Sequence, residues 1–383
     1  MLASVLKPVD DTRMRGKFAE TLRERPNVQV HIAGRAVADA RLQGSFAAQE
    51  QVRQHPIFEG SRLSLGRLMA QVRYWQLLER LQPALVVVHA PELLPLTLLW
   101  RWLGRGRRFI YDIRENYALN VRTQRVYGGL VRRVLAAGLR WVETRAAQNG
   151  SAIILAEASY AAELPYLRLL PANRVVVLEN KYQPAPDEPL AARAHQLPPP
   201  DQPLRLLYSG TISELNGVWD AIAFARQLRS AWPGGVQLTI IGFCQQPGLL
   251  RQLQEVVAQN SAWLKLIGGA EMVPHADIVA EIGRSDLGLL PYRPHTSTER
   301  CRPTKLFEYL AHGLPILASP NPLWQALIHQ YGAGLSVDFV APLDGPSFAA
   351  RLRGTIFYPN GIPADASWAS EGKKLWLLLD SLV

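Results

Sequence analysis

Short apolar runs alternate with longer amphipathic stretches along the first half of the chain. One run, Leu-Val-Val-Val at 85–88, is apolar at every position, as buried parallel strands are. Strands are predicted at residues 2–6, 28–32, 85–89, 109–112, 152–155 and 175–178. Helices are predicted between them at residues 12–24, 63–81, 92–102 and 121–145. This alternation predicts βαβ units and hence a doubly wound parallel sheet.

A proline-rich segment at residues 183–203 interrupts the alternation and is typical of a domain linker. Beyond it, strands are predicted at residues 204–209, 236–242, 264–267, 287–291 and 315–319. Helices are predicted at residues 247–260, 275–284, 304–312, 322–331 and 368–382, with a further one that ends near Trp232. We therefore predict an α/β protein with two tandem Rossmann-like domains that face a cleft, the first at 1–182 and the second at 204–365.

Composition excludes several classes of protein. With 383 residues, 48% of them apolar, the chain can form two hydrophobic cores. Two cysteines, Cys244 and Cys301, make neither a disulfide framework nor a zinc pattern, and their number favours a reducing compartment. No apolar run is long enough to span a bilayer, and the opening residues are too short for a signal peptide. A cytoplasmic location is expected.

The net charge of +10 favours an anionic partner. Nucleic acid is not expected, because no basic run is interleaved with stacking aromatic residues. Arginines gather instead in two apolar stretches of the first half, at 93–108 and 121–145. Both stretches are typical of basic amphipathic helices on an anionic membrane surface, although ordinary domain helices with solvated arginines look the same. We predict peripheral contact with the inner face of the plasma membrane.

Residues 302–319 hold the clearest chemical pattern in the chain. Lys305 and Glu308 are three positions apart, so they share one face of a helix that ends at Gly313. Lys305 lies in the first turn, where its charge opposes the helix dipole and a bound phosphate would compensate. Glu308 is one turn further on and is suited to a sugar diol. The pair predicts a sugar-nucleotide site, while an ordinary surface ion pair has the same spacing.

Several small or polar residues follow predicted strands directly. Glu115, Gly210, Gly242 and Pro291 all come after such strand ends, and Lys305 opens a later helix. Ligands of open parallel sheets bind at the carboxyl ends of the strands. The positions therefore predict one site rather than scattered surface features.

With these motifs in place, the chain resembles the retaining glycosyltransferases of family 4, which have the GT-B fold, over nearly its whole length. The strongest similarity is Pro-Thr-Lys-Leu-Phe-Glu-Tyr-Leu-Ala-His-Gly-Leu-Pro-Ile-Leu-Ala at 303–318, which looks like the donor-binding signature. Further similar motifs, in chain order, lie at 9–14, 111–117, 207–213, 286–292 and 367–371. The last of these implies a terminal segment, 366–383, that packs back on the first domain.

The resemblance implies roles for residues in both domains. Glu308 would bind the ribose hydroxyls, and Lys305 with the amides after Gly210 would hold the diphosphate. The implied donor-binding residues are Gly210, Thr211, Ile267, Tyr292, Glu299, Arg302, Lys305, Leu306 and Glu308. The implied acceptor-binding residues are Asp10, Arg13 and Arg114.

Retaining transfer on this fold need not use an enzyme base, so Glu115 and Asp11 are only the first catalytic candidates to test. Asp10 and Asp11 also suit the N-cap of the helix that follows them. No Asp-x-Asp motif lies near the donor segment. We therefore expect no metal and no cofactor, with a nucleotide-diphosphate sugar as substrate.

The sequence departs from the family pattern at four positions. Arg300 stands where a glutamate is usual, with Glu299 one residue away; Thr211 and Asn216 replace an arginine and a lysine; Arg114 replaces a histidine. We favour a variant that transfers a sugar to a lipid-linked or oligosaccharide acceptor in cell-envelope polysaccharide assembly. The alternatives are an inactive homologue that acts as a binding subunit and, less favoured, a nucleotide-sugar epimerase.

Overall fold

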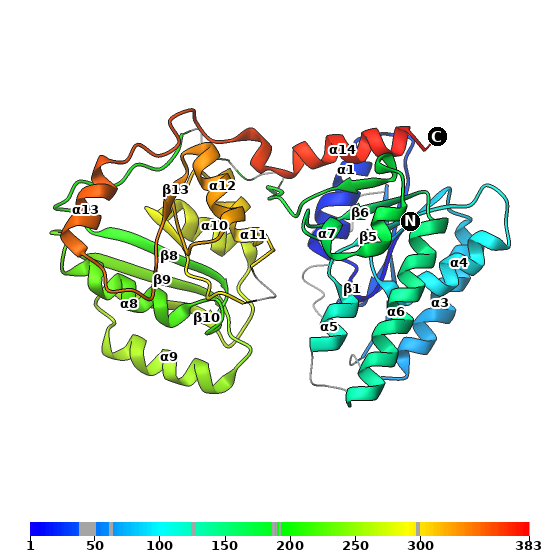
Figure 1. The fold of residues 1–383 in the computed structure, drawn as a ribbon, viewed down its shortest axis with the longest axis horizontal. Helices are drawn as coiled ribbons and strands as arrows, with labels where there is room; N and C mark the ends of the chain where they lie inside the picture. The colour runs from blue at the N-terminus through cyan, green and yellow to red at the C-terminus, as the bar shows by residue number, and fades with distance from the viewer. Residues whose placement is uncertain are drawn as a thin grey trace. The chain divides into compact units, whose positions relative to one another are not determined.

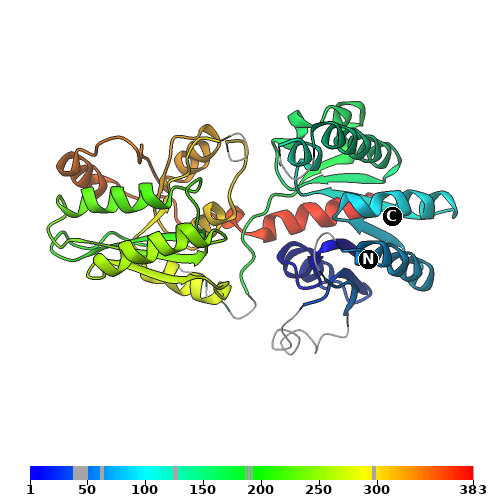
Figure 2. The ribbon, with the colours of Figure 1, turned by 90° about the horizontal axis from the view of Figure 1, so that it is seen from below.

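The computed structural model describes residues 1–37, 51–60, 64–123, 128–185, 188, 190, 193–295 and 299–382. The chain divides into two compact units (Figure 1 and Figure 2), the first formed by Met1–Gln183 with Trp368–Val383 and the second by Pro184–Ser367. Each unit has one parallel sheet with flanking helices. The predicted α/β class with two Rossmann-like units is thus confirmed, and the proline-rich segment belongs to the second unit from Pro184 onward.

The first unit contains a seven-stranded parallel sheet in the order β3-β2-β1-β4-β5-β6-β7. Its strands are β1 (Leu2–Pro8), β2 (Val30–Arg35), β3 (Val52–Phe58), β4 (Leu85–Val88), β5 (Arg108–Ile113), β6 (Ala152–Leu155) and β7 (Val175–Val177). The sequence pattern did not predict β3, which reads Val-Arg-Gln-His-Pro-Ile-Phe. It is an edge strand, and an edge tolerates both the polar residues and Pro56.

Helices cover both faces of this sheet. Val86 and Val88 of β4 point to a core shared with α3 (Gly66–Leu81), α4 (Leu94–Trp102) and α6 (Gly129–Asn149). Val87 points to the opposite core, shared with η1 (Thr12–Ala19) and α14 (Trp368–Asp380). Shorter helices are α1 (Glu20–Leu22), η2 (Pro91–Leu93), α5 (Tyr117–Thr123), α7 (Tyr160–Glu163), η3 (Pro165–Leu169) and η4 (Ala172–Arg174).

Two helices of the first unit differ in their bounds from the sequence prediction. The helix predicted at 63–81 is α3, which begins at Gly66 with Leu65 as its N-cap; residues 61–63 lie outside the described residues. The single helix predicted at 121–145 corresponds to the end of α5 and most of α6. Residues 124–127 between them lie outside the described residues, and Gly128-Gly129 marks the start of α6.

The second unit contains a six-stranded parallel sheet in the order β10-β9-β8-β11-β12-β13. Its strands are β8 (Leu204–Thr211), β9 (Val236–Phe243), β10 (Leu264–Gly269), β11 (Leu287–Leu290), β12 (Ile316–Ala318) and β13 (Gly334–Ser336). Its helices are α8 (Val218–Arg229), α9 (Pro247–Gln259), α10 (His275–Arg284), α11 (Thr304–Ala311), α12 (Pro322–Tyr331), α13 (Gly345–Gly354) and η5 (Ala364–Ala366). The strand β13 was missed because three half-buried residues at an edge carry too little pattern.

The helix α14 is fixed to the first unit, although the chain reaches it only after the second unit (Figure 1). Its first residue, Trp368, is 1% exposed; the indole N–H donates to Thr21 Oγ1 at 2.9 Å and the backbone N–H to the Tyr182 carbonyl at 2.6 Å. One turn on, the buried Glu371 pairs with Lys181 at 2.8 Å and accepts from the Glu179 N–H at 3.2 Å. Burial and polar contacts therefore both anchor this end of α14.

We expect Trp368→Ala to lower the free energy of unfolding by about 3–5 kcal/mol, because a cavity replaces a buried indole and Thr21 loses its partner. Urea unfolding measures the loss, and limited trypsin digestion should release α14 early. Leu377→Ala on the same helix, where the side chain is 72% exposed, is the control and should change stability by less than about 0.5 kcal/mol. Equal effects of the two substitutions would contradict the anchoring role.

Candidate functional site

A small cavity of about 230 Å³ opens at the carboxyl ends of strands β8 and β11 in the second unit. It is lined by Gly210, Thr211, Ile278, Tyr292, Pro303, Thr304, Lys305 and Glu308. Five of these residues are among those predicted from the sequence to bind the donor. The topology brings them together because β8, β11 and the start of α11 meet at one edge of the sheet.

Lys305 is the most unusual group in this cavity. Its side chain is 7% exposed, and its Nζ has no hydrogen-bond partner among the residues that the structure describes. The ammonium lies 4.6 Å from the ring centroid of Tyr208 and 5.1 Å from that of Tyr292, which are cation–π distances. Burial lowers the pKa of Lys305 to about 8, against the opposing charge of Glu308. A buried cation without a bonded anion is suited to an anionic ligand.

Gly210, at the end of β8, has a backbone conformation that favours glycine. Its φ is +91°, a left-handed conformation that glycine adopts readily, and a Cβ there would lie 3.6 Å from Lys305 Cε. The loop that follows is held by Asn216, whose side-chain amide donates to the Thr211 carbonyl at 3.0 Å and whose N–H donates to Ser213 Oγ at 3.1 Å. Asn216 therefore fixes the loop and supplies no charge to the cavity.

Glu308 faces the cavity from the second turn of α11. Its Oε1 lies 3.1 Å from Nε2 of His275, the first residue of α10. The sequence pattern did not reveal His275, because the contact joins positions that are distant in the chain and the histidine stands in no recognisable motif. His275 orients the carboxylate of Glu308 toward the cavity wall formed by α10 and α11.

The other predicted donor residues lie elsewhere in the second unit. Leu306 is fully buried, so the structure corrects its predicted donor contact to a core position. Ile267 belongs to β10, which is separated from β8 by β9. Glu299 lines a neighbouring cavity of about 370 Å³, where its carboxylate lies 3.9 Å from Arg300 Nε. Arg302 is half-buried and lies outside both cavities.

In the first unit, Asp11 and Arg114 form a nearly buried ion pair at the carboxyl ends of β1 and β5. The guanidinium donates to both carboxylate oxygens, at 2.8 and 3.0 Å. Asp11 also caps η1 by accepting from the N–H groups of Arg13 and Met14 at 3.1 and 3.0 Å. Burial alone would raise the pKa of Asp11, but Arg114 and the capping bonds outweigh it and lower that pKa. This geometry favours the capping role for Asp11 over a catalytic one.

Arg13 was predicted to contact the acceptor, but the structure places its side chain in the interior of the first unit. The side chain is 0% exposed, and its Nε and Nη2 donate to Asp112 at 2.8 and 2.7 Å. Its Nη1 donates to the Leu178 carbonyl at 3.0 Å and to Asn180 Oδ1 at 2.9 Å. Arg13 thus connects η1, β5 and the end of β7 through buried hydrogen bonds. The sequence could not reveal this role because the partners of Arg13 lie at least 99 residues away.

His89 completes the same buried network. Its Nδ1 lies 2.7 Å from Asp112 Oδ2, and its Nε2 has no partner within the described part of the chain. Burial lowers the pKa of His89 more strongly than Asp112 raises it. The histidine is therefore neutral at pH 7 and, with its edge against Phe18 at 5.2 Å between ring centroids, occupies the core position that its strand-end location suggests.

Asp10 and Glu115 are the more accessible carboxylates at this edge. Burial, with the nearby charge of Asp11, raises the pKa of Asp10. Glu115 is 45% exposed; it accepts from Asn120 Nδ2 at 2.9 Å and lies 3.8 Å from Lys7 Nζ. Within the described ranges, no three His, Cys, Asp or Glu side chains gather closely enough to hold a metal ion.

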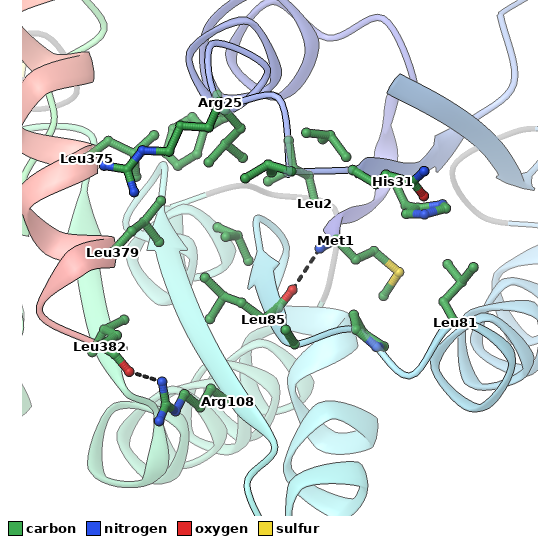
Figure 3. Close-up of a pocket in the computed structure, with 18 of the residues that line it drawn as sticks. Met1, Leu2, Arg25, His31, Leu81, Leu85, Arg108, Leu375, Leu379 and Leu382 are labelled. Atoms are coloured by element: carbon green, nitrogen blue, oxygen red, sulfur yellow. Dashed lines mark hydrogen bonds between the residues drawn. The ribbon is translucent and has the colours of Figure 1, made fainter. Parts of the chain in front are cut away.

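A larger apolar cavity of about 480 Å³ lies at the opposite end of the first sheet (Figure 3). Leu2 and Leu85 line it from the sheet, and Leu375 and Leu379 line it from α14. It adjoins the amino ends of β1 and β4, where the Met1 amino group donates to the Leu85 carbonyl at 2.7 Å. Parallel sheets bind ligands at the other edge, so we assign no substrate to this cavity.

Comparisons with known proteins agree with this geometry. No family model matches the sequence. A curated relative, glycogen synthase of Mycobacterium tuberculosis (strain H37Rv), is 28% identical over 253 residues, which are 65% of this chain and 56% of that protein. The match thus spans little more than half the length of the relative.

Two solved structures are similar over almost the whole chain. WaaG, a glycosyltransferase involved in lipopolysaccharide biosynthesis, has a TM-score of 0.58 at 16% identity and covers 98% of this chain and 94% of its own. Anabaena Alr3699/HepE in complex with UDP-glucose also has a TM-score of 0.58, at 13% identity, and covers 98% of this chain and 99% of its own. The fold is therefore the two-domain GT-B fold of these proteins.

We expect Arg13→Met to lower the free energy of unfolding at pH 7 by about 3–5 kcal/mol, because Asp112 would become an uncompensated buried charge. Asp112 has a depressed pKa when folded, with Arg13 outweighing burial. The ion pair therefore stabilises the fold above the unfolded-state pKa of about 4, and its contribution is lost as the pH falls toward the folded-state pKa. The difference between variant and wild type should shrink below about pH 4 in urea unfolding.

Arg25→Met is the matched control, because Arg25 pairs with Asp380 at 2.7 Å on the exposed surface. It should change stability little at any pH. If Arg13→Met were as stable as wild type and bound an acceptor more weakly, the result would contradict the structural role and support acceptor binding by Arg13.

Proposed function

We propose that this protein is a glycosyltransferase that moves a sugar from a nucleoside diphosphate donor to a glycan acceptor. The observation that carries the proposal is Lys305, a buried ammonium at the carboxyl edge of a Rossmann-like sheet to which no anionic group of the described residues is bonded. A leaving diphosphate supplies the missing negative charge. The similarity to glycogen synthase and to WaaG supports the same activity.

We propose the following contacts between the donor and the cavity. Lys305 and the N–H groups at the start of α11 and after Gly210 hold the diphosphate, and Glu308, oriented by His275, binds the ribose diol. Tyr292 and, beyond it, the cavity that contains Glu299 offer room for the base or the sugar. HepE was solved with UDP-glucose, so a uridine nucleotide is the first donor to test.

We further propose that transfer needs no divalent metal. A preorganised lysine and a helix N-terminus can stabilise the charge that builds on the leaving diphosphate. We also propose retention of configuration, with the acceptor hydroxyl assisted by the donor phosphate rather than by an enzyme base. Proton NMR of the product's anomeric centre tests this, and an inverted product would refute it.

On the acceptor side we propose roles for Asp10, Glu115 and Arg114. The two carboxylates are accessible enough to accept hydrogen bonds from sugar hydroxyls. WaaG acts in lipopolysaccharide biosynthesis, which supports a lipid-linked acceptor here. We propose that the protein meets this acceptor at the inner face of the plasma membrane.

A second candidate, an inactive homologue that only binds nucleotide, is favoured by one observation. Thr211 and Asn216 stand where the resemblance expects two cations, and the Asn216 amide is used within its own loop. The two candidates differ in a simple assay, because only an enzyme releases free nucleoside diphosphate from a nucleotide sugar.

We expect UDP to raise the melting temperature by several degrees in a thermal shift assay, equally with EDTA and with magnesium. Glu308→Ala should weaken this binding about tenfold or more, because charged hydrogen bonds to the ribose are lost. Lys265→Ala, which removes an exposed lysine of the same unit, is the control and should leave the shift unchanged. If no nucleoside diphosphate shifted the wild type, the donor proposal would fail.

Lys305→Met should have opposite effects on stability and on nucleotide binding, a combination not expected for a lysine with a purely structural role. Replacing a buried ammonium that has no hydrogen-bond partner among the described residues by an apolar side chain should stabilise the free protein by about 1–3 kcal/mol. The same substitution should abolish the response to UDP. A destabilised free protein that still binds UDP would contradict the assigned role.

Nucleotide affinity should also depend on pH through Lys305. The diphosphate binds the charged lysine, whose pKa in the free protein is about 8. Affinity should therefore be level from pH 7 to about 8 and then fall, by up to about tenfold per pH unit, because binding must first protonate the lysine. Lys305→Arg keeps its charge throughout, so calorimetric titrations of this variant should show a flat profile. A flat wild-type profile would count against Lys305 as the diphosphate ligand.

A further inference from the structure

The helical layer formed by α3, α4 and α6 exposes much apolar surface on its outer side. All three helices pack on the same face of the first sheet, so their outer sides form one surface. Of the 19 large hydrophobic residues that are exposed in the described part of the chain, 13 lie between Leu65 and Trp141. Single exposed apolar residues are ordinary, but such a concentration marks an interaction surface.

Four of these exposed residues lie in the first two turns of α6. Leu130 is 77% and Val134 63% exposed, and Val131 and Leu135 on other sides of the same turns are also exposed. The helix therefore projects from the body of the unit here rather than covering it. The short helix α5 packs beside it (Figure 1) and adds the exposed Leu119. We name this surface the α5–α6 tip, formed by Leu119, Leu130, Val131, Arg133, Val134 and Leu135.

The surroundings of the tip are strongly basic. Residues 64–149 contain 14 arginines and five acidic residues, a surplus of nine in a chain whose net charge is +10. No acidic residue occurs from Asn116 to Val142, whereas Arg122, Arg132 and Arg133 adjoin the apolar positions of the tip. An apolar tip within a basic field matches the chemistry of an anionic lipid surface.

The tip also lies at the functional edge of the first unit. The helix α6 leads from the end of β5 back to the start of β6 in a parallel pair, so its N-terminus is at the carboxyl edge of the sheet. That edge carries Asp10, Glu115 and Arg114, and α5 begins at Tyr117, two residues after Glu115. A surface held by the tip is therefore close to the proposed acceptor residues.

We propose that the α5–α6 tip docks on an anionic phospholipid bilayer and so presents the neighbouring carboxylates to a lipid-linked acceptor. This inference rests on the proposed function only for the identity of the acceptor. Leucine and valine side chains enter the boundary between headgroups and acyl chains, and the arginines bind lipid phosphates. Among the described helices, none is both long and apolar enough to cross a membrane, so docking is at the surface.

Other occupants fit the tip less well. A second copy bound through the same surface would bring two arginine-rich, acid-free faces together, and like charges repel. Single-stranded nucleic acid binds on aromatic stacking platforms, whereas the tip presents aliphatic side chains. The bilayer satisfies both the apolar residues and the charge.

Flotation of the purified full chain with vesicles tests the proposal. Wild type should float with vesicles of phosphatidylglycerol and phosphatidylcholine at low ionic strength and should not float with phosphatidylcholine alone. The double variants Leu130→Ser/Val134→Ser and Arg132→Glu/Arg133→Glu should each reduce the bound fraction about tenfold. The controls are Val340→Ser/Ile356→Ser and Arg351→Glu/Arg353→Glu, at exposed positions of the second unit, and both should float like wild type.

The UDP-induced thermal shift, measured on every variant, separates this proposal from the donor site. Tip variants that keep the shift and fail to float support membrane docking, whatever the acceptor proves to be. Wild type that remains at the bottom of the gradient, or tip variants that float as well as the controls, would overturn the proposal. So would light scattering that shows a wild-type dimer converted to monomer by the tip substitutions without any binding to vesicles.

Discussion

Every strand pairing in the two sheets is parallel, and this constraint governs the rest of the structure. Parallel neighbours need a crossover, so a helix follows nearly every strand, and the strands of each sheet all end at one edge. That edge gathers loops from distant parts of the chain. Asp11 and Arg114 meet there in the first unit, and Gly210 and Lys305 meet there in the second.

Two buried cations show how differently such an edge can be used. Arg13 is surrounded by acceptors, with Asp112 at 2.7 Å, so its charge stabilises the fold. Lys305 is also buried, but its Nζ has no hydrogen-bond partner among the described residues and lies near the rings of Tyr208 and Tyr292. Desolvation of an unpaired charge is unfavourable, and a fold keeps such a group where a ligand completes it. The arrangement of hydrogen-bond partners, rather than residue type or burial, distinguishes the structural Arg13 from the proposed ligand-binding Lys305.

The sequence predicts what is local and leaves out what is brought together by the fold. The valine run before His89 and the Lys305–Glu308 spacing are local, so the parallel strand and the shared helix face were predicted. Strand β3 escaped prediction because an edge strand needs little apolar pattern. Arg13 and His275 were misjudged or missed since their partners, Asp112 and Glu308, are distant in sequence. A charged residue in a loop after a strand looks the same whether it will face solvent or an internal carboxylate.

The anchoring of α14 has a consequence for biosynthesis. Phe18 and Thr21 in the first unit are covered by Trp368, which the ribosome adds only after the entire second unit. During translation, the apolar groove that receives α14 stays open while the second unit, Pro184–Ser367, is synthesised, which adds more than 180 residues. Nascent chains with open apolar surface are prone to association, so a chaperone has a defined place and interval in which to act. The first unit is begun first and finished last.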